Sequence, residues 1–180
     1  MSKKIEEQIH AVYDYLCEGK IKELKKEGRV LPTCYAVTST PKNDIAIMPI
    51  PLINLRSDSE MKFLLYEMSK LIKKENIKVK MFMIVSEAFM NKGDKKLSED
   101  SEKMETLVLS ARDCFDNENY QILKIEKKNG KVERLDPLDD IINEWKKIHP
   151  LKPNEVIKDS KIVAQDSLLD SIWKEYRSIK

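Results

Sequence analysis

The chain has 180 residues, of which 41% are hydrophobic and 36% are charged. This length and composition are typical of one globular domain that buries its own core without disulfides or metals. The 33 basic and 31 acidic residues leave a net charge of +2, which argues against nucleic-acid binding through phosphate neutralisation. No apolar run approaches the roughly 20 residues that span a bilayer, and the polar start MSKKIEEQ has no signal-peptide core. We therefore expect a cytoplasmic protein that does not bind a membrane.

The cysteines and histidines do not form a recognisable site in the sequence. Cys17, Cys34 and Cys114 are odd in number and far apart, which predicts reduced thiols. Cys34 lies on an apolar strand and is interpreted as an inert core thiol. His10 and His149 have no ligand-spaced partner, which argues against a zinc site, and four glycines leave little material for a phosphate loop. We expect no bound cofactor.

The N-terminal segment predicts a helix. Apolar residues recur at helical spacing from Ser2 to about Glu18, and Gly19 is the predicted end. A second, more exposed helical piece then leads to Gly28, which is predicted to end it.

Residues 30–40 and 45–52 predict two strands, because both are rich in apolar and β-branched residues. The Pro-Lys-Asn-Asp segment between them has turn chemistry. Pro49 and Pro51 cannot donate to a ladder, so the second strand is expected to end there or to lie at a sheet edge.

The clearest helix is predicted over Ser57 to Glu75. Ser57 and Glu60 have the spacing of a capping box. The apolar residues form one stripe suited to packing on a sheet: Met61, Leu64, Leu65, Met68, Leu71 and Ile72.

The densest basic patch of the chain follows at the end of this helix and at the start of the next strand. It consists of Lys70, Lys73, Lys74, Lys78 and Lys80. We interpret it as charge complementarity at a helix end together with solubility. The alternative is a surface that faces phosphate groups.

The stretch from Ile77 to Asp113 is predicted to form the centre of the sheet. It opens with IKVKMFMIVSEAFM, crosses the polar loop NKGDKKLSEDSEK and returns as METLVLSARD. Two strands joined by a charged loop are the simplest interpretation, and the first is apolar enough on both faces to lie mid-sheet.

The hairpin signal Asn129-Gly130 follows, between two extended runs. Asp136 and Pro137 are then interpreted as the N-cap and first residue of a helix. Its apolar face is predicted to carry Leu138, Ile141, Ile142, Trp145 and Ile148.

The last helix is predicted from about Asp166 to Ile179, after an irregular connector over residues 151–165. Ser167 and Asp170 are placed to cap it. Its dense apolar face carries Leu168, Leu169, Ile172, Trp173, Tyr176 and Ile179.

These elements predict a single α+β domain. We expect a mostly antiparallel sheet of about five or six strands with a helix packed across it, and further helices at the N- and C-termini. Residues 1–135 form the α+β domain in this scheme. Residues 136–180 form a helical C-terminal appendage, which either belongs to the same folding unit or acts as an interface arm.

Two carboxylates are the candidate site. Glu87 lies where the central strand leaves the core, and Glu105 lies on the returning strand, so antiparallel pairing brings them towards one another. Carboxylates at a strand end can hold Mg²⁺ or Mn²⁺, or act as an acid and a base. In the opposing interpretation, Glu87 makes a structural hydrogen bond or ion pair. The acidic residues of the polar loop, Asp94, Glu99, Asp100 and Glu102, are then simply solvated.

The segments VSEAFM and LSEDSEKMETLVLSARD resemble a family of small uncharacterised proteins of prokaryotes and their phages. In that family a Ser-Glu-Ala-aromatic motif ends a strand, and a polar loop leads to a Glu and an apolar strand. The resemblance covers about residues 30–132 and implies the fold and a prokaryotic or viral origin, with no settled activity. This chain departs from it at Phe89, where the family has tryptophan, and at Ser101 and Lys103.

Two functions from different classes follow. The first is a non-catalytic binding or regulatory protein that acts through a protein partner in a phage–host or defence setting. The second is a Mg²⁺- or Mn²⁺-dependent hydrolase or nuclease that uses Glu87 and Glu105. For the first, the expected interface is on the last helix, as a homodimer or with another protein, and folding back on the chain's own sheet is the alternative. The expected interface residues are Leu169, Ile172, Trp173 and Tyr176.

Overall fold

The described part of the chain has a helix at each end, with the strands of one sheet and a further helix between them. The computed structural model describes residues 2–39, 45–52, 58–75, 77–91, 103–138 and 161–178. In chain order the elements are α1 (Ser2–Glu27), β1 (Thr33–Ser39), β2 (Ile45–Pro51), α2 (Asp58–Lys74), β3 (Lys78–Asn91), β4 (Lys103–Asp113), β5 (Glu118–Lys128), β6 (Lys131–Pro137) and α4 (Lys161–Ser178). Among them, no helix is long and apolar enough to cross a bilayer.

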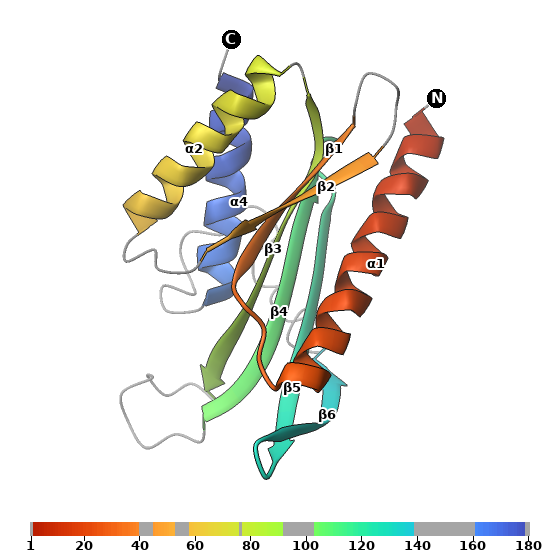
Figure 1. Cartoon of the computed structure of the whole chain (residues 1–180), viewed down its shortest axis with the longest axis vertical. Coiled ribbons are helices and arrows are strands. Elements are labelled where there is room, and N and C mark those ends of the chain that lie inside the picture. The colour runs from red at the N-terminus through yellow and green to blue at the C-terminus, as the bar shows by residue number, and fades with distance from the viewer. Residues whose placement is uncertain are drawn as a thin grey trace.

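The strands form one six-stranded sheet in the order β2-β1-β3-β4-β5-β6. Every neighbouring pair is antiparallel, which confirms the expected α+β fold (Figure 1). β3 is the longest strand, and β3 and β4 pair in the middle of the sheet, as their apolar sequence predicts. β2 is an outer strand, as its two prolines predict.

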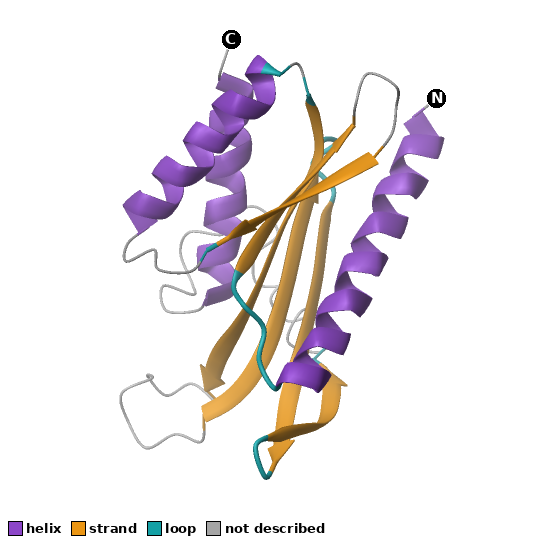
Figure 2. Cartoon of the chain, in the orientation of Figure 1, coloured by secondary structure: helices purple, strands orange, loops and turns teal. Residues whose placement is uncertain are grey.

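Helices cover both faces of the sheet. Side chains point alternately to the two faces along each strand, so each face has its own set of buried residues. Figure 2 shows α1 on one side of the strands and α2 and α4 on the other. The α1 side buries, among others, Leu16, Leu24, Val37, Met81, Met83, Val85, Leu107 and Leu109. The α2 and α4 side buries Cys34, Ala36, Ile72, Phe82, Ile84, Leu169, Ile172 and Trp173.

The first helix is longer than the sequence predicts. Gly19 does not end it, and α1 continues to Glu27. A glycine inside a helix costs only about 1 kcal/mol, and the turns after Gly19 bury Leu24 completely in the core. Tertiary packing therefore outweighs the local preference. Gly28 does end the helix, with φ at +73° and its N–H bonded to the Leu24 carbonyl at 2.9 Å.

The α2 stripe is mostly as predicted. Leu64, Met68 and Ile72 pack into the core on this side of the sheet. Leu71 is 56% exposed, so its prediction is wrong. The buried face is rotated towards Ser69, which is 1% exposed, and Leu71 is left at the margin. Residue 57 of the predicted capping box, and the side chains of residues 61 and 65, lie outside the described residues.

The β5–β6 connection is the predicted hairpin. Asn129 and Gly130 have φ values of +52° and +77°, the left-handed conformations that a type I′ turn requires. The helix start predicted at Asp136 and Pro137 is wrong, because both residues belong to β6 and pair with β5. An outer strand tolerates a proline, which has no N–H to donate. The helix predicted beyond Leu138 lies outside the described residues.

The last helix begins at Lys161, earlier than predicted, so Ser167 and Asp170 lie inside it and do not cap it. The segment Lys161–Gln165 contains Lys, Ala and Gln, which favour helix, and no Gly or Pro. α4 packs on α2, β3 and β4 and supplies part of their common core.

A pair of glycine substitutions in α1 tests this account of the helix. Gly28→Ala should lower the free energy of unfolding by about 1–2 kcal/mol, because alanine is strained at a positive φ. A Cβ at Gly28 would also lie 3.3 Å from the Gly130 carbonyl oxygen. Gly19→Ala should instead raise stability by about 0.5–1 kcal/mol, since nothing lies within 4 Å of its Cβ position. Urea denaturation of both variants measures the two effects. If both substitutions changed the free energy of unfolding in the same direction, the different roles given to Gly19 and Gly28 would be wrong.

Candidate functional site

Glu87 is tied to the backbone that leads from α1 into β1. Its Oε1 accepts a hydrogen bond from the backbone N–H of Val30, which is buried. Glu87 pairs across the sheet with Leu107, whose side chain faces α1. A buried amide without an acceptor costs roughly 1–3 kcal/mol, so this contact holds the end of β3 to the chain just after α1. The geometry matches the structural interpretation of Glu87.

Glu105 lies on the same face of the sheet but has a different partner. The register pairs Phe89 with Glu105 and Glu87 with Leu107, so the two carboxylates are diagonal neighbours on the α1 side. Diagonal positions in an antiparallel pair lie about 7–8 Å apart at their Cα atoms. Glu105 forms an ion pair with Lys127 of the neighbouring β5. Antiparallel pairing therefore brings the two residues near one another, as predicted, and each makes its own contact.

Among the described residues, no three His, Cys, Asp or Glu side chains are grouped so that they could hold a metal ion. Asp94, Glu99, Asp100 and Glu102 lie outside the described residues. His10 is exposed on α1 and lies 3.8 Å from Asp14 of the same helix.

The three cysteines are free thiols, of which Cys17 and Cys34 are buried and Cys114 is partly buried. Burial raises the pKa of Cys34 to about 12 and that of Cys17 to about 11. Burial also raises the pKa of Cys114. A thiol must ionise to act as a strong nucleophile. The structure therefore agrees with the interpretation of Cys34 as an inert core thiol.

The apolar face of α4 is buried within the chain. Leu169, Ile172 and Trp173 are at most 3% exposed, and Tyr176 is half-buried. Trp173 and Tyr176 pack edge-on against Phe82 of β3, with ring centroids at 5.0 and 6.1 Å. The face thus folds back on its own sheet, the alternative that the sequence left open. A partner interface at these four residues stays a prediction.

Polar contacts fix α4 in place on the sheet. The Trp173 Nε1–H donates to the Arg112 carbonyl at 3.1 Å, and the Arg112 guanidinium pairs with both Asp170 of α4 and Glu118 of β5. One turn further along α4, Arg177 pairs with Asp116 at 2.7 Å. Sequence reasoning missed Arg112, whose only signal is a basic residue inside an apolar strand.

Tyr176 joins α4 to an irregularity in β3. The β1–β3 register shifts between Val37 and Thr38, so Lys80 is an extra residue that forms a bulge. The Val79 N–H beside the bulge donates to the Tyr176 hydroxyl at 3.1 Å, and the Lys80 carbonyl accepts from Cys114 N–H at 2.8 Å. The bulge therefore leaves these backbone groups satisfied, and it fixes the position of α4.

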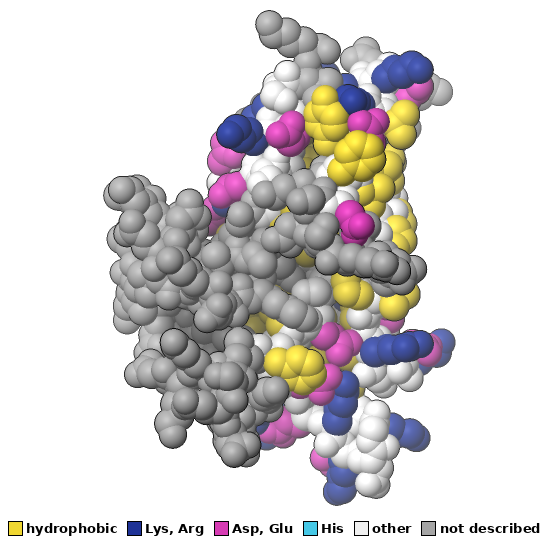
Figure 3. Space-filling view, turned by 90° about the vertical axis from the view of Figure 1, so that its left-hand side faces the viewer, with side chains coloured by type: hydrophobic (Ala, Val, Ile, Leu, Met, Phe, Trp, Pro, Cys, Tyr) yellow, Lys and Arg dark blue, Asp and Glu magenta, His cyan; other side chains and the backbone are white. Residues whose placement is uncertain are grey.

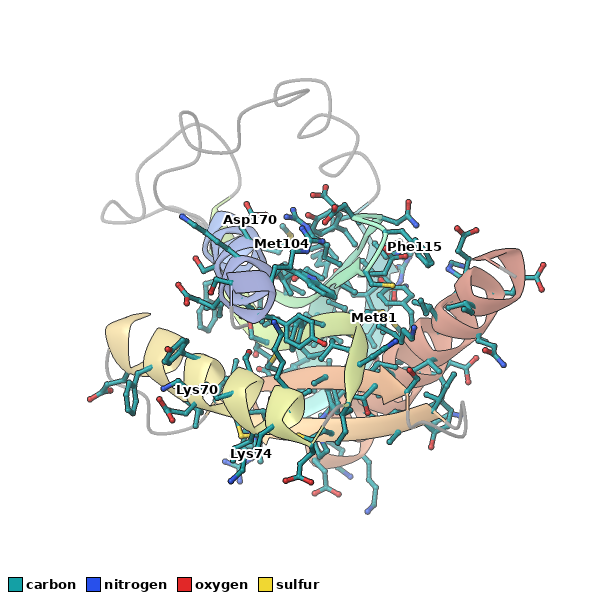
Figure 4. All side chains as sticks on the ribbon, turned by 90° about the horizontal axis from the view of Figure 1, so that it is seen from above. Lys70, Lys74, Met81, Met104, Phe115 and Asp170 are labelled. Atoms are coloured by element: carbon teal, nitrogen blue, oxygen red, sulfur yellow. The ribbon has the colours of Figure 1, made fainter. Side chains whose placement is uncertain are left out.

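The basic patch is partly engaged in local contacts. Lys70 pairs with Glu67 at 2.9 Å and lies 4.2 Å from the centroid of the Tyr66 ring. Lys73 lies 5.2 Å from the centroid of the Tyr176 ring. These contacts favour the structural interpretation of the patch over a phosphate-binding surface. Figure 4 shows Lys70 and Lys74 on α2, seen from above.

A groove lies between α2 and α4, with a volume of about 560 Å³. Its lining residues are Phe63 and Tyr66 of α2 and Leu168, Ser171, Ile172, Lys174 and Glu175 of α4. Phe63 is 67% exposed at its rim. Figure 3 views the side of the molecule that carries these helices and shows apolar side chains exposed among charged ones. The sequence signal for this groove was Phe63, an aromatic residue off the buried stripe, and it was missed.

No model of a known protein family matches this chain. No curated protein and no solved structure matches it either.

Substitutions at Glu87 test its role as an anchor. Glu87→Ala should lower the free energy of unfolding by about 1–3 kcal/mol, because the buried Val30 N–H loses its acceptor. Glu87→Gln should lower it less, since the amide oxygen can still accept that bond. Glu105→Ala is the control and should cost only about 0–1 kcal/mol, as for a partly exposed ion pair. Thermal or urea denaturation measures all three effects. A Glu87→Ala variant as stable as the wild type would show that Glu87 is not a structural anchor.

Proposed function

We propose that this protein is a non-catalytic binding or regulatory protein of prokaryotic or phage origin that acts through a protein partner. A phage–host or defence setting fits the family that the sequence resembles. The observation that carries the proposal is the groove between α2 and α4. In this groove the exposed side chain of Phe63 lines one hollow together with the buried Leu168 and Ile172.

The chemistry of the groove suits an apolar anchor from a partner. Leu168 and Ile172 form its floor, Phe63 and Tyr66 form one wall, and Lys174 and Glu175 lie on the opposite helix. Protein interfaces concentrate their binding energy in a few aromatic or aliphatic anchors that fill such hollows, with polar residues around them. A partner helix that inserts one large apolar side chain is a recurring way to occupy a groove between helices.

The alternative, a Mg²⁺- or Mn²⁺-dependent hydrolase, has less support in the geometry. Glu87 accepts a hydrogen bond from a buried backbone amide, and Glu105 pairs with Lys127. A metal would have to compete with both contacts. Each carboxylate has a structural purpose that accounts for its presence without catalysis.

Peptide selection tests the groove directly. Peptides selected from a random displayed library on the full chain should carry a large apolar residue and bind Phe63→Ala at least tenfold more weakly, a loss of about 1.4 kcal/mol. Leu71→Ala is the matched control, since Leu71 is also exposed on α2 and does not line the groove. Its affinity should equal that of the wild type. Peptides that bind Phe63→Ala as tightly as wild type would place the binding site elsewhere.

Thermal melting with and without millimolar Mg²⁺ or Mn²⁺ tests the alternative. A ligand that binds only the folded state must raise the midpoint. Under the binding-protein proposal the midpoint of the wild type stays unchanged beyond the effect of ionic strength, for which Na⁺ at matched ionic strength is the control. A metal-specific rise that disappears in both Glu87→Gln and Glu105→Gln would favour the hydrolase.

A further inference from the structure

The two outer strands of the described sheet differ sharply in chemistry. β6 carries charged residues at Lys131, Glu133, Arg134 and Asp136. β2 has the sequence IAIMPIP and carries no polar side chain, although only Ile50 within it is buried. Proteins usually protect an outer strand with charges or prolines, because its unpaired backbone groups can add another strand. β6 follows that pattern along its length, and β2 follows it only at Pro49 and Pro51.

Along β2, the backbone N–H and C=O groups point towards β1 at one residue and away from it at the next. The N–H of Leu52 donates to the Pro32 carbonyl at 2.8 Å, one pair beyond the Thr33–Pro51 pair. The even-numbered residues of β2 therefore face the β1 backbone. The backbone groups of the odd-numbered residues, Ile45, Ile47, Pro49 and Pro51, point away from β1. This position suits the two prolines, because they have no N–H to donate to β1.

Within the part of the chain that the structure describes, the outward edge of β2 is thus open in its first half, and the prolines close its second half. Ile45 and Ile47 each present an N–H and a carbonyl to the outside. At Pro49 and Pro51 the ring carbon takes the place of the N–H and keeps another strand away. Within β2, an added strand can therefore pair along Ile45–Met48.

We propose that a second copy of this chain pairs with β2 in antiparallel orientation, with Ala46 of both copies on the two-fold axis. In this register the N–H and carbonyl of Ile45 bond to those of Ile47 in the second copy, and the reverse bonds follow by symmetry. The open donors and acceptors of one edge are therefore complementary to those of an identical edge. Ile45 and Ala46, both exposed in the single chain, become covered.

The residue at the axis fits the geometry of this pairing. Ala46 falls between the two hydrogen-bonded pairs, at a position where opposite Cα atoms approach to about 4.5 Å. Its short side chain allows that approach. The prolines limit the ladder, and the charged β6 edge discourages pairing on the other side, so the assembly closes as a dimer and does not grow into a fibre. The α4 face is already used within the chain, and β2 does not line the α2–α4 groove, so this inference is independent of the proposed function.

A charge exchange at the axis tests the dimer. Wild-type protein should have twice the chain mass of 21.0 kDa in light scattering after size exclusion. Ala46→Glu and Ala46→Lys should each be monomeric, because like charges then meet across the axis, and an equimolar mixture of the two should recover the dimer mass. Tyr15→Glu is the control, since Tyr15 is 69% exposed on α1, and it should remain dimeric. Circular dichroism and melting check that each variant is folded.

A cysteine at the axis gives a second measurement that does not depend on weakening the dimer. Opposite Cα atoms at about 4.5 Å lie within the range of 4.4–6.8 Å that a disulfide spans. Ala46→Cys should therefore form a covalent dimer under mild oxidation. Glu133→Cys on β6 and the wild type, with its own three cysteines, should not. A wild type that is monomeric at all concentrations, charge variants that keep the dimer mass, or a mixture that stays monomeric would each overturn the inference.

Discussion

The pairing of β3 with β4 is the constraint on which the rest of the structure depends. Both strands bury side chains on their two faces, Met83 and Leu109 towards α1, and Ile84 towards α2 and α4. A sheet that is apolar on both sides is stable only when each side is covered. This explains why α1 is one long helix despite Gly19, and why α4 returns from the far end of the chain to lie beside α2.

Polar side chains at the margins of this core serve mainly to satisfy backbone groups. Glu87 accepts from Val30 N–H, and the Tyr176 hydroxyl accepts from Val79 N–H beside the β3 bulge. The buried carboxylate of Asp113 accepts from the backbone N–H groups of Phe115 and Asn117 in the β4–β5 turn, at 2.8 and 2.9 Å. A buried amide without a partner is costly, so each of these contacts is worth retaining for stability alone. Acidic residues near strand ends are therefore weak indicators of chemistry in this fold.

The surface features that the fold does not use are the ones that suggest function. The α2–α4 groove leaves Phe63 exposed beside the buried Leu168 and Ile172. The β2 edge is apolar although the opposite edge of the sheet is charged. Neither feature improves the packing of a single chain, and each exposes apolar surface to water. The two proposed contacts, one with a protein partner and one with a second copy of the chain, would each cover one of these surfaces.

Local sequence determined the elements whose signals act over a few residues. Proline at Pro49 and Pro51 placed β2 at an edge, Asn129 and Gly130 set the hairpin, and alternating or continuous apolar runs marked the strands. The positions of Leu64, Met68 and Ile72 on the packed face of α2 followed from helical spacing, whereas Leu71 did not. The position of Glu87 and Glu105 on one face followed from antiparallel pairing. These features depend on backbone preferences and on periodicity, which can be read without knowledge of distant contacts.

The tertiary structure decided what depends on partners far along the chain. Gly19 remains helical because Leu24 has a core to enter, and Asp136 stays in a strand because β5 lies beside it. Glu87 meets Val30 across 57 positions, and Arg112 meets Asp170 from another element, so neither contact has a sequence spacing that predicts it. The apolar face of α4 packs on the chain's own sheet, where the Phe82 ring contacts Trp173. The Val79 N–H beside the β3 bulge donates to the Tyr176 hydroxyl. Local preferences amount to about 1 kcal/mol per residue, whereas burying one large apolar side chain contributes about 1.5–3 kcal/mol, so packing prevails wherever the two disagree.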